Sequence, residues 1–447
     1  MGHVVEPQKN VPIAQEADVV VAGGGVSGII AAIAAARAGA KTVLVDRFGA
    51  PGGNIGPGML VGGSLTGWPG RSIDGGICGI VREFIETHGD KGGGSVPPFS
   101  AGHYMKDSYV ASYVATKMLT ESGVELMLSA YAADPILDGT RVAGLYVENK
   151  SGRQAIPAAV VIDATGEADV ARRAGAPVNY PNPEIKERGR TMGIQLVVGG
   201  IDWDRHDGRD PQQWLERYAK IMEKAGEDGE FAPTHEVPGL CTLHGFEYRI
   251  SGPREAGTAS GYVGVDWPDN LNQGDGAHIS RMEIEMRNRC FETAAFWKKH
   301  VPGFENSYLL NIAPFLGSRG GPAIDGEVTL TQDDIDAERK FDDVIFVFVN
   351  RRADPPGRMD APYRSLVPKE IDGLLACGRS AARRPGSLMR GRAMMMLGGQ
   401  VAGTAAAMAV QAGVTPRALD VPALQRALLD AGLYLGDRSR LKELGLI

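Results

Sequence analysis

The chain has few cysteines and no two of them are close together. Its 447 residues contain four, at Cys78, Cys241, Cys290 and Cys377, and none belongs to a C-x-x-C pair. Such spacing argues against a disulfide framework or a zinc knuckle and favours reduced, buried thiols in the cytoplasm. The histidines lack the spacing of metal ligands, so we expect no metal site.

Long hydrophobic runs are also missing. The least polar stretches, 29–36 and 402–410, are alanine-rich and too short to cross a bilayer, so we expect no membrane span. Residues 1–17 have no basic region followed by an apolar one, which argues against a signal peptide. The net charge of −7 gives no electrostatic reason to bind nucleic acid. The G-x-S-x-G motif of serine hydrolases is absent.

Glycine, by contrast, is abundant, and its best-ordered cluster lies near the start of the chain. An apolar strand leads into Gly23, Gly25 and Gly28 in G-x-G-x-x-G spacing, and an alanine-rich helix follows. These glycines allow a tight turn, close approach to a pyrophosphate and close helix–strand packing. A second apolar strand ends in Asp46, which is placed to accept hydrogen bonds from ribose hydroxyls. The pattern predicts an adenine-dinucleotide site.

The predicted pattern of strands and helices changes along the chain. The alternation of strands and helices fades after about residue 180 and returns after about residue 355. We therefore expect an irregular leader (1–17), a dinucleotide-binding domain in two parts (18–180 and 356–447) and a domain inserted between them (181–355). Helices are predicted over 80–87, 108–122 and 281–299 and from about 398, and strands over 124–128, 141–148, 154–157, 159–162 and 374–377. Ser280 and Glu283 form a capping-box pattern before the third helix.

Several motifs together carry a resemblance to a known family. They are the glycine cluster with its terminal Asp46, the loop 52–54, and the segments 160–176, 372–380 and 399–410. These resemble FAD-dependent oxidoreductases of the glutathione-reductase-like superfamily, nearest the group related to succinate dehydrogenase and fumarate reductase flavoproteins. The resemblance implies an α/β fold. Its Rossmann-like, glutathione-reductase-type FAD-binding domain would be split in sequence by an inserted α+β substrate domain.

The same resemblance implies which residues hold FAD. No histidine lies in the loop 52–58, so a covalent histidyl–flavin bond is not expected. A helix beginning near Gly399 would direct its N-terminus at the flavin pyrimidine ring, where its dipole stabilises negative charge. The residues implied in cofactor binding are Gly23, Gly25, Val26, Ser27, Gly28, Asp46, Arg47, Gly52, Gly53, Asn54, Ala130, Ala132, Ala164, Thr165, Gly166, Gly378, Arg379, Gly399 and Gln400.

The candidate catalytic residues are arginines and a His–Tyr pair. Arg319 and Arg390 match the family pattern, and Arg384 lies where relatives often carry a histidine. An arginine can clamp a carboxylate, although a salt bridge between domains is an equal alternative. His103 and Tyr104 end the glycine-rich loop and could relay a proton, whereas a surface or core role is the commoner one for a single histidine.

The resemblance implies a small-molecule substrate that gains or loses two electrons as hydride at flavin N5. Two alternatives stay open: a flavin-dependent monooxygenase, and a redox-silent flavin-binding scaffold. The altered block after Arg319, which reads Gly-Gly-Pro, motivates the second of these. A homo-oligomer is expected only because such assemblies are common.

Overall fold

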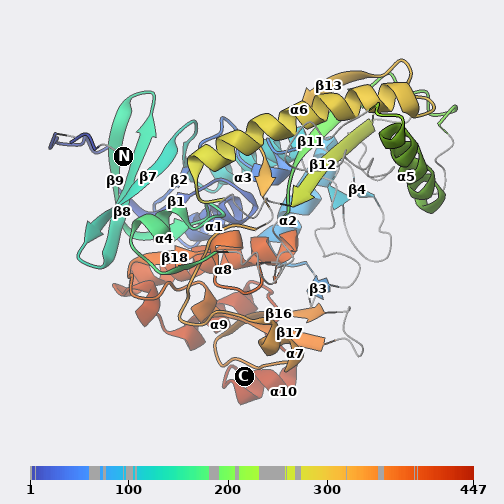
Figure 1. Ribbon diagram of the computed structural model, residues 1–447. Helices are drawn as coiled ribbons and strands as arrows, with labels where there is room; N and C mark the ends of the chain where they lie inside the picture. The colour runs from blue at the N-terminus through green and yellow to red at the C-terminus, as the bar shows by residue number, and fades with distance from the viewer. Residues whose placement is uncertain are drawn as a thin grey trace.

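The computed structural model describes most of the chain. The described residues are 3–5, 7–59, 71–73, 77–93, 95–96, 104–105, 108–180, 191–206, 211–230, 257, 259–266, 273–318, 320–350, 357–386, 388–389 and 391–447. Within them, helices and strands form a mixed α/β fold around a parallel sheet, as the sequence predicts (Figure 1).

The parallel sheet draws its strands from both ends of the chain. Its order is β6-β2-β1-β9-β18, with β1 at Ala17–Ala22, β2 at Thr42–Val45, β6 at Glu125–Met127, β9 at Gly152–Asp163 and β18 at Leu374–Ala376. β18 lies far along the sequence, yet Leu374 pairs with Val161 and Ala376 pairs with Asp163. The carboxyl ends of five segments that are remote in sequence therefore meet at one edge.

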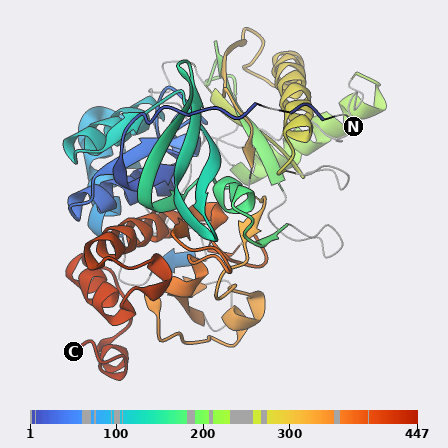
Figure 2. The same cartoon turned by 90° about the vertical axis from the view of Figure 1, so that its left-hand side faces the viewer.

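Strand β9 pairs with different partners along its length. Its first half pairs antiparallel with β8 (Arg141–Asn149), which pairs with β7 (Tyr131–Asp138), and its second half pairs with β1. The prediction of separate strands at 154–157 and 159–162 is wrong. Pro157 suggested a break, but it lies where pairing changes from β8 to β1, and proline is tolerated at such a position. Figure 2 shows β7–β9 beside the central sheet, with the C-terminal helices below them.

The two faces of β1 pack against different layers because successive side chains of a strand point to opposite sides. Val19 and Val21 belong to the core formed with the helices, whereas Val20 and Ala22 belong to the core shared with β7–β9. All four are fully buried. Burial on both faces is typical of a parallel sheet and explains the unbroken apolar run in the sequence.

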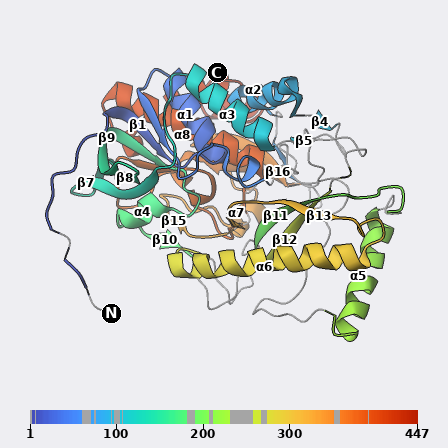
Figure 3. The same ribbon diagram turned by 90° about the horizontal axis from the view of Figure 1, so that it is seen from above.

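Two small-residue helices lie side by side over the first of these faces (Figure 3). They are α1 (Val26–Arg37) and α8 (Arg392–Ala412). A Cβ atom at Gly399 would overlap the carbonyl oxygen of Ser27, and one at Gly403 would overlap that of Ala31. Glycine at both positions therefore lets the two backbones approach closely. The prediction that this helix begins near residue 398 is wrong, since α8 begins six residues earlier.

Among the described residues, α8 is the one helix that is long and apolar enough to cross a membrane. Its most apolar window has a mean hydropathy of 1.4, but 83% of that window is buried inside the protein. This degree of burial is what the core helix of a folded domain shows, and its small residues serve the packing on α1.

The other predicted helices are present with modest changes. α2 (Gly79–His88) and α3 (Ser108–Glu121) confirm the predictions and pack in the core with α1. α6 (Gly276–His300) begins one turn earlier than predicted. Its N-cap is Asp275, whose side chain accepts hydrogen bonds from the backbone N–H groups of Ala277 and His278, so the predicted capping box at Ser280 is wrong.

A second, antiparallel sheet follows in the middle of the chain. β11 (Thr191–Gly199) pairs with β12 (Ala259–Asp266) on one side and with β13 (Tyr308–Ile312) and β14 (Gly317–Ser318) on the other. α6 lies across this sheet, and α5 (Pro211–Glu227) lies near its end (Figure 1). Tyr218 and Trp297 connect α5 to α6 in a buried core, where the indole N–H donates to the tyrosine oxygen over 3.0 Å.

The C-terminal part adds a third sheet and short elements. The sheet is β17-β16-β3, with β3 at Arg71–Ile73, β16 at Val344–Asn350 and β17 at Gly357–Pro362. Helices α9 (Val421–Asp430) and α10 (Arg438–Glu443) follow it near the C-terminus. The remaining elements are η1 (Gly53–Ile55), η2 (Gly89–Gly93), β4 (Ser95–Val96), β5 (Tyr104–Met105), α4 (Asp169–Arg173), β10 (Val178–Asn179), β15 (Ala323–Ile324), α7 (Gln332–Asp336), η4 (Tyr363–Ser365), η5 (Gly378–Ser380) and η6 (Pro416–Ala418).

The close packing of α1 on α8 predicts opposite effects for one substitution at two positions of α8. Gly403→Ala should lower the free energy of unfolding by about 1–3 kcal/mol, because the added methyl group overlaps Ala31 and forces the helices apart. Gly398→Ala is the matched control: its Cβ would meet nothing within 4 Å, so it should be neutral or stabilising by about 0.5–1 kcal/mol. Denaturant unfolding measures both, and equal effects at the two positions would contradict the packing.

Candidate functional site

The turn between β1 and α1 leaves a helix end open. Gly23 has a φ of +104° and closes the turn, and a Cβ at Gly28 would overlap the Gly23 carbonyl oxygen. Gly25 is the N-cap of α1 and makes no side-chain cap, and a Cβ there would meet nothing within 4 Å. An uncapped helix N-terminus with free space beside it suits a phosphate. Val26 and Ser27 form the first turn of this helix.

The segment after β2 packs directly on this turn. The backbone N–H of Gly52 donates to the Gly24 carbonyl oxygen over 2.8 Å. A Cβ on Gly53 would lie 2.8 Å from the Cα of Gly25, so only glycine permits this approach. Ser112 on α3 holds the segment from the other side by donating to the Pro51 carbonyl oxygen over 2.9 Å. Asn54 is thereby placed in η1, beside the open helix end.

Asp46 carries an unsatisfied buried oxygen. The side chain is 5% exposed, and its Oδ1 accepts a 3.3 Å hydrogen bond from the backbone N–H of Phe48. Oδ2 is buried and finds no hydrogen-bond partner among the described residues. Burial raises the pKa of Asp46 to about 6, against the opposing effects of the Phe48 N–H and the Arg47 charge. A ligand that brings hydroxyl donors to this oxygen would satisfy it.

A buried carboxylate shapes the loop after β9. Asp163 is fully buried, and its Oδ1 accepts hydrogen bonds from the backbone N–H of Thr165 (3.1 Å) and from its hydroxyl (2.7 Å). Oδ2 accepts from the N–H groups of Val170 and Ala171, both at 3.0 Å, at the start of α4. Burial raises the pKa of Asp163, while these donors favour its charged form. The carboxylate thus sets the path of Ala164 and Thr165.

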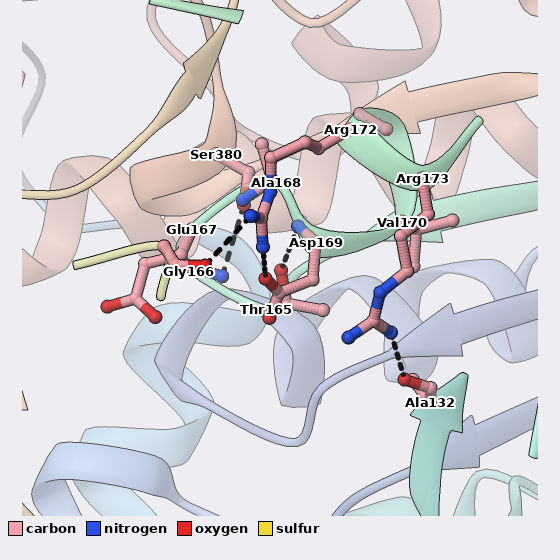
Figure 4. A network of polar contacts seen from close by, with 12 residues as sticks. Ala132, Thr165, Gly166, Glu167, Ala168, Asp169, Val170, Arg172, Arg173 and Ser380 are labelled. Carbon is pink, nitrogen blue, oxygen red and sulfur yellow. Dashed lines mark hydrogen bonds and ion pairs between the residues drawn. The ribbon is translucent and has the colours of Figure 1, made fainter. Parts of the chain in front are cut away.

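Ser380 connects this loop to the one after β18. Its Oγ accepts hydrogen bonds from the N–H groups of Gly166 (3.1 Å) and Ala168 (3.0 Å), as Figure 4 shows. The residue comes from the far end of the chain, and sequence reasoning missed both it and Asp163. The signal for Asp163 was available, since an acidic residue at the end of a fully apolar strand needs a local partner.

The loop after β18 also touches the first helix. Gly378 has a φ of +65°, and a Cβ there would overlap the hydroxyl oxygen of Ser27. Arg379 points elsewhere: its guanidinium donates to the Gly320 carbonyl oxygen over 2.6 Å and to the Glu167 carboxylate over 3.3 Å. Burial raises the pKa of the Glu167 carboxyl, and the charge of Arg379 opposes that shift.

Gly399 and Gln400 lie well inside α8 and not at its N-terminus, which corrects the role expected for them. Gly399 lies against Ser27 of α1, and the Gln400 side-chain oxygen accepts a 3.2 Å hydrogen bond from the N–H of Ile80. The glycine pair marks a close helix contact and not a helix start. Gly391 is the N-cap of α8.

Two further residues predicted to bind the cofactor, Ala130 and Ala132, lie where β6 leads into β7. Ala130 is fully buried, and its N–H donates to the backbone oxygen of Asp46 over 3.0 Å. The carbonyl oxygen of Ala132 accepts a 2.8 Å hydrogen bond from Arg173 on α4 (Figure 4). The segment is therefore joined to both β2 and α4.

The side chains of most candidate catalytic residues fall outside what the structure describes. Arg319, Arg390 and His103 lie outside the described residues, and Tyr104 belongs to β5, whose side chains are not described. Arg384 is exposed. Its neighbour Arg383 is 5% exposed, and its guanidinium donates to the carbonyl oxygens of Gly378 (2.9 Å), Ala381 (3.1 Å) and Gly386 (3.2 Å).

A small, mostly apolar pocket opens between the loop after β18 and the start of α8. Its lining includes Gly378, Arg383, Met389, Met394 and Met395. The pocket therefore adjoins the N-terminal end of α8. Within the residues that the structure describes, no group of three or more His, Cys, Asp or Glu side chains could hold a metal ion.

The predicted cofactor residues converge at one edge of the parallel sheet. The loops that begin at Gly23, Asp46, Ala164 and Gly378 follow β1, β2, β9 and β18, whose carboxyl ends lie together. This edge is where open α/β sheets bind their ligands. The open end of α1 and the unsatisfied Asp46 oxygen fit the pyrophosphate and ribose of a dinucleotide.

Comparison with known proteins identifies a family. A family model described as "FAD dependent oxidoreductase" matches residues 18–428, and no curated protein matches significantly. Among solved structures, a geranylgeranyl bacteriochlorophyll reductase-like protein from Thermoplasma acidophilum is 14% identical, with 93% of this chain and 83% of that one covered and a TM-score of 0.44.

Two further solved structures are similar at the same level. The flavin-dependent brominase Bmp2 is 14% identical over 93% of this chain and 83% of its own, with a TM-score of 0.45. The OxyS anhydrotetracycline hydroxylase from Streptomyces rimosus is 12% identical over 92% and 65%, with a TM-score of 0.42. The family model spans nearly the whole chain, and the chain therefore belongs to the FAD dependent oxidoreductase family.

Proposed function

We propose that this FAD-dependent oxidoreductase binds its cofactor without a covalent bond and transfers two electrons to or from a small organic substrate. The observation that carries the binding proposal is the buried Oδ2 of Asp46, which lacks a partner beside an uncapped helix end. A buried acceptor without a donor is costly, so a ligand with vicinal hydroxyls gains by supplying one. Bound FAD would supply hydride chemistry at flavin N5.

Different residues of the chain would hold different parts of the extended cofactor. The first turn of α1, at Gly25, Val26 and Ser27, would hold the pyrophosphate, because backbone N–H groups and the helix dipole favour anions there. Asp46 would hold the ribose. Gly378 would lie against the phosphate and ribityl part, since it already contacts Ser27.

The remaining cofactor contacts would come from loops. Ala130 and Ala132 would lie against the adenine edge. Their backbone is hydrogen-bonded to Asp46, which follows β2, and to Arg173 on α4. Thr165 and Gly166, held by Asp163 and Ser380, would lie along the adenosine and pyrophosphate. Gly52, Gly53 and Asn54 would complete the site beside the helix end.

A division into domains follows from the pairing of strands. We infer that residues 18–180 and 356–447 form one FAD-binding domain of the glutathione-reductase type, because β18 pairs with β9 in a single sheet. Residues 181–355 would hold the inserted substrate domain, formed by the sheet of β11–β14 under α6, although β16 within this range pairs with β3 and β17 of the FAD-binding part. Cys78, Cys290 and Cys377 are buried free thiols, which suits a reducing cytoplasm.

Purified protein should take up FAD and show bound-flavin absorbance. Denaturing precipitation should then release all of the yellow colour into the supernatant, because nothing in the proposed site forms a covalent bond to the flavin. Anaerobic addition of candidate substrates should bleach the bound flavin when the right chemical class is reached. Protein that stays colourless with excess FAD would contradict cofactor binding. Colour retained in the pellet would contradict only the non-covalent attachment.

The affinity for FAD should depend on pH through Asp46. Burial raises the pKa of its carboxyl in the apoprotein to about 6, above its value in the unfolded chain. The protonated carboxyl therefore contributes to the stability of the apoprotein below about pH 4, and this contribution is lost as the pH rises through about 6. Ribose hydroxyls favour the carboxylate, and FAD should therefore bind up to about tenfold more tightly at pH 7 than at pH 5.

Asp46→Asn should remove this dependence and weaken binding at pH 7 by roughly tenfold or more, since a charge-assisted hydrogen bond is lost. The matched control is Asp18→Asn, at the end of β1 that lies away from the Gly23 turn. The Asp18 side chain accepts a hydrogen bond from the Lys41 N–H. This control should keep the wild-type pH profile. Fluorescence titration of FAD measures all three proteins, and a pH profile that survives in Asp46→Asn would refute the role of Asp46.

A further inference from the structure

A segment of the second sheet lies against several of the loops that form the proposed FAD site. Its described residues are Phe315–Ser318, Gly320 and Gly321, and we call them the strap. The strap is part of the second sheet, because Gly317 and Ser318 form β14 and pair with Gly193 and Met192 of β11. It is also tied to α6, since the Leu316 N–H donates to the Glu283 carboxylate over 2.7 Å.

One end of the strap lies over the residues that follow Asp46. The rings of Phe315 and Phe48 stack with centroids 4.3 Å apart and an interplanar angle of 22°. The Arg47 guanidinium lies 4.8 Å from the centroid of the Phe48 ring and 5.6 Å from that of Phe315. Stacked aromatic pairs and cations over rings attract each other beyond simple burial. The strap is therefore attached at the ribose end of the site.

The middle of the strap lies close to the segment that packs on the open end of α1. A Cβ on Gly317 would lie 3.4 Å from the side-chain oxygen of Asn54. A Cβ on Gly58 would lie 3.0 Å from the tip of the Phe315 ring. The strap and this segment are therefore in close contact, and the Gly58 position leaves little room for a side chain.

The other end of the strap meets the loops after β9 and β18. Arg379 donates to the Gly320 carbonyl oxygen over 2.6 Å and to Glu167 over 3.3 Å, so a single guanidinium joins the strap to both loops. A Cβ on Gly321 would lie 2.8 Å from the Cγ of Glu167. In Figure 4 the Glu167 side chain points away from the contacts between Asp169 and Arg172, and its carboxylate is the group that accepts from Arg379.

We propose that the strap closes over the FAD site and that Arg379 is the positioning residue that holds it closed. The sequence assigned Arg379 to the cofactor itself, whereas its hydrogen bonds go to Gly320 and Glu167. The strap contacts span the site from the Asp46 end to the Gly166 end. FAD release therefore requires the Phe48–Phe315 stack and the Arg379 contacts to separate. This inference rests on the proposed function, because it concerns the same site.

The rate of FAD release tests the strap. Arg379→Gln and Phe315→Leu should each raise the dissociation rate constant roughly threefold to tenfold, because each removes one attachment of the strap. Arg379→Lys should restore most of the wild-type rate, since it keeps a charged donor. Thermal unfolding of the apoproteins should change little in comparison. Release is measured by stopped-flow fluorescence with an excess of a competing flavin-binding apoprotein.

Two controls separate the strap from general destabilisation. Glu83→Gln removes a surface partner of Arg37 on α1, away from the strap, and should release FAD at the wild-type rate. The double variant Phe48→Leu with Phe315→Leu should release FAD no faster than the faster single variant, because both changes break the same stack.

The outcomes distinguish the two proposals. If the wild-type protein binds FAD and both Arg379→Gln and Phe315→Leu release it at the wild-type rate, the strap is refuted and the proposed function stands. If the wild-type protein binds no FAD, the proposed function fails and the strap fails with it.

Discussion

The pairing of β9 with β1 on one side and with β18 on the other is the constraint on which the site depends. Each of these strands ends in a loop that needs an exact position, and parallel pairing places all their carboxyl ends at one edge. Without β18, the loop that carries Gly378 and Ser380 would have no fixed relation to α1. The site thus joins two parts of the chain that lie more than 200 residues apart, such as Gly166 and Ser380.

Polar groups that are buried at this edge explain both its order and its capacity to bind. Asp163 is surrounded by donors from its own loop, and its burial therefore organises the backbone. Asp46 is also buried but leaves one oxygen without a donor among the described residues. The first carboxylate is satisfied within the protein, whereas the second one keeps an oxygen for which the proposed cofactor would supply a donor. Burial costs the same kind of free energy in both cases, and only the local donors decide the outcome.

Some of the structure could be predicted from local pattern alone. The apolar run of β1, the glycine turn and the helix that follows obey rules that act over a few residues, and their prediction is confirmed. Two of the errors occur where a residue serves a distant partner. Gly399 suggests a helix start, although it allows contact with Ser27 of α1. Pro157 suggests a strand end, although β9 only changes its pairing partner there.

The amino-acid sequence by itself determined the cofactor class, since the spacing of Gly23, Gly25 and Gly28 and the acid at Asp46 are local requirements of a dinucleotide site. Tertiary structure alone decided which oxygen of Asp46 lacks a partner and where the guanidinium of Arg379 is directed. Both depend on chain segments brought together from far apart in sequence, and burial and hydrogen bonding between such segments follow from packing and not from local propensity.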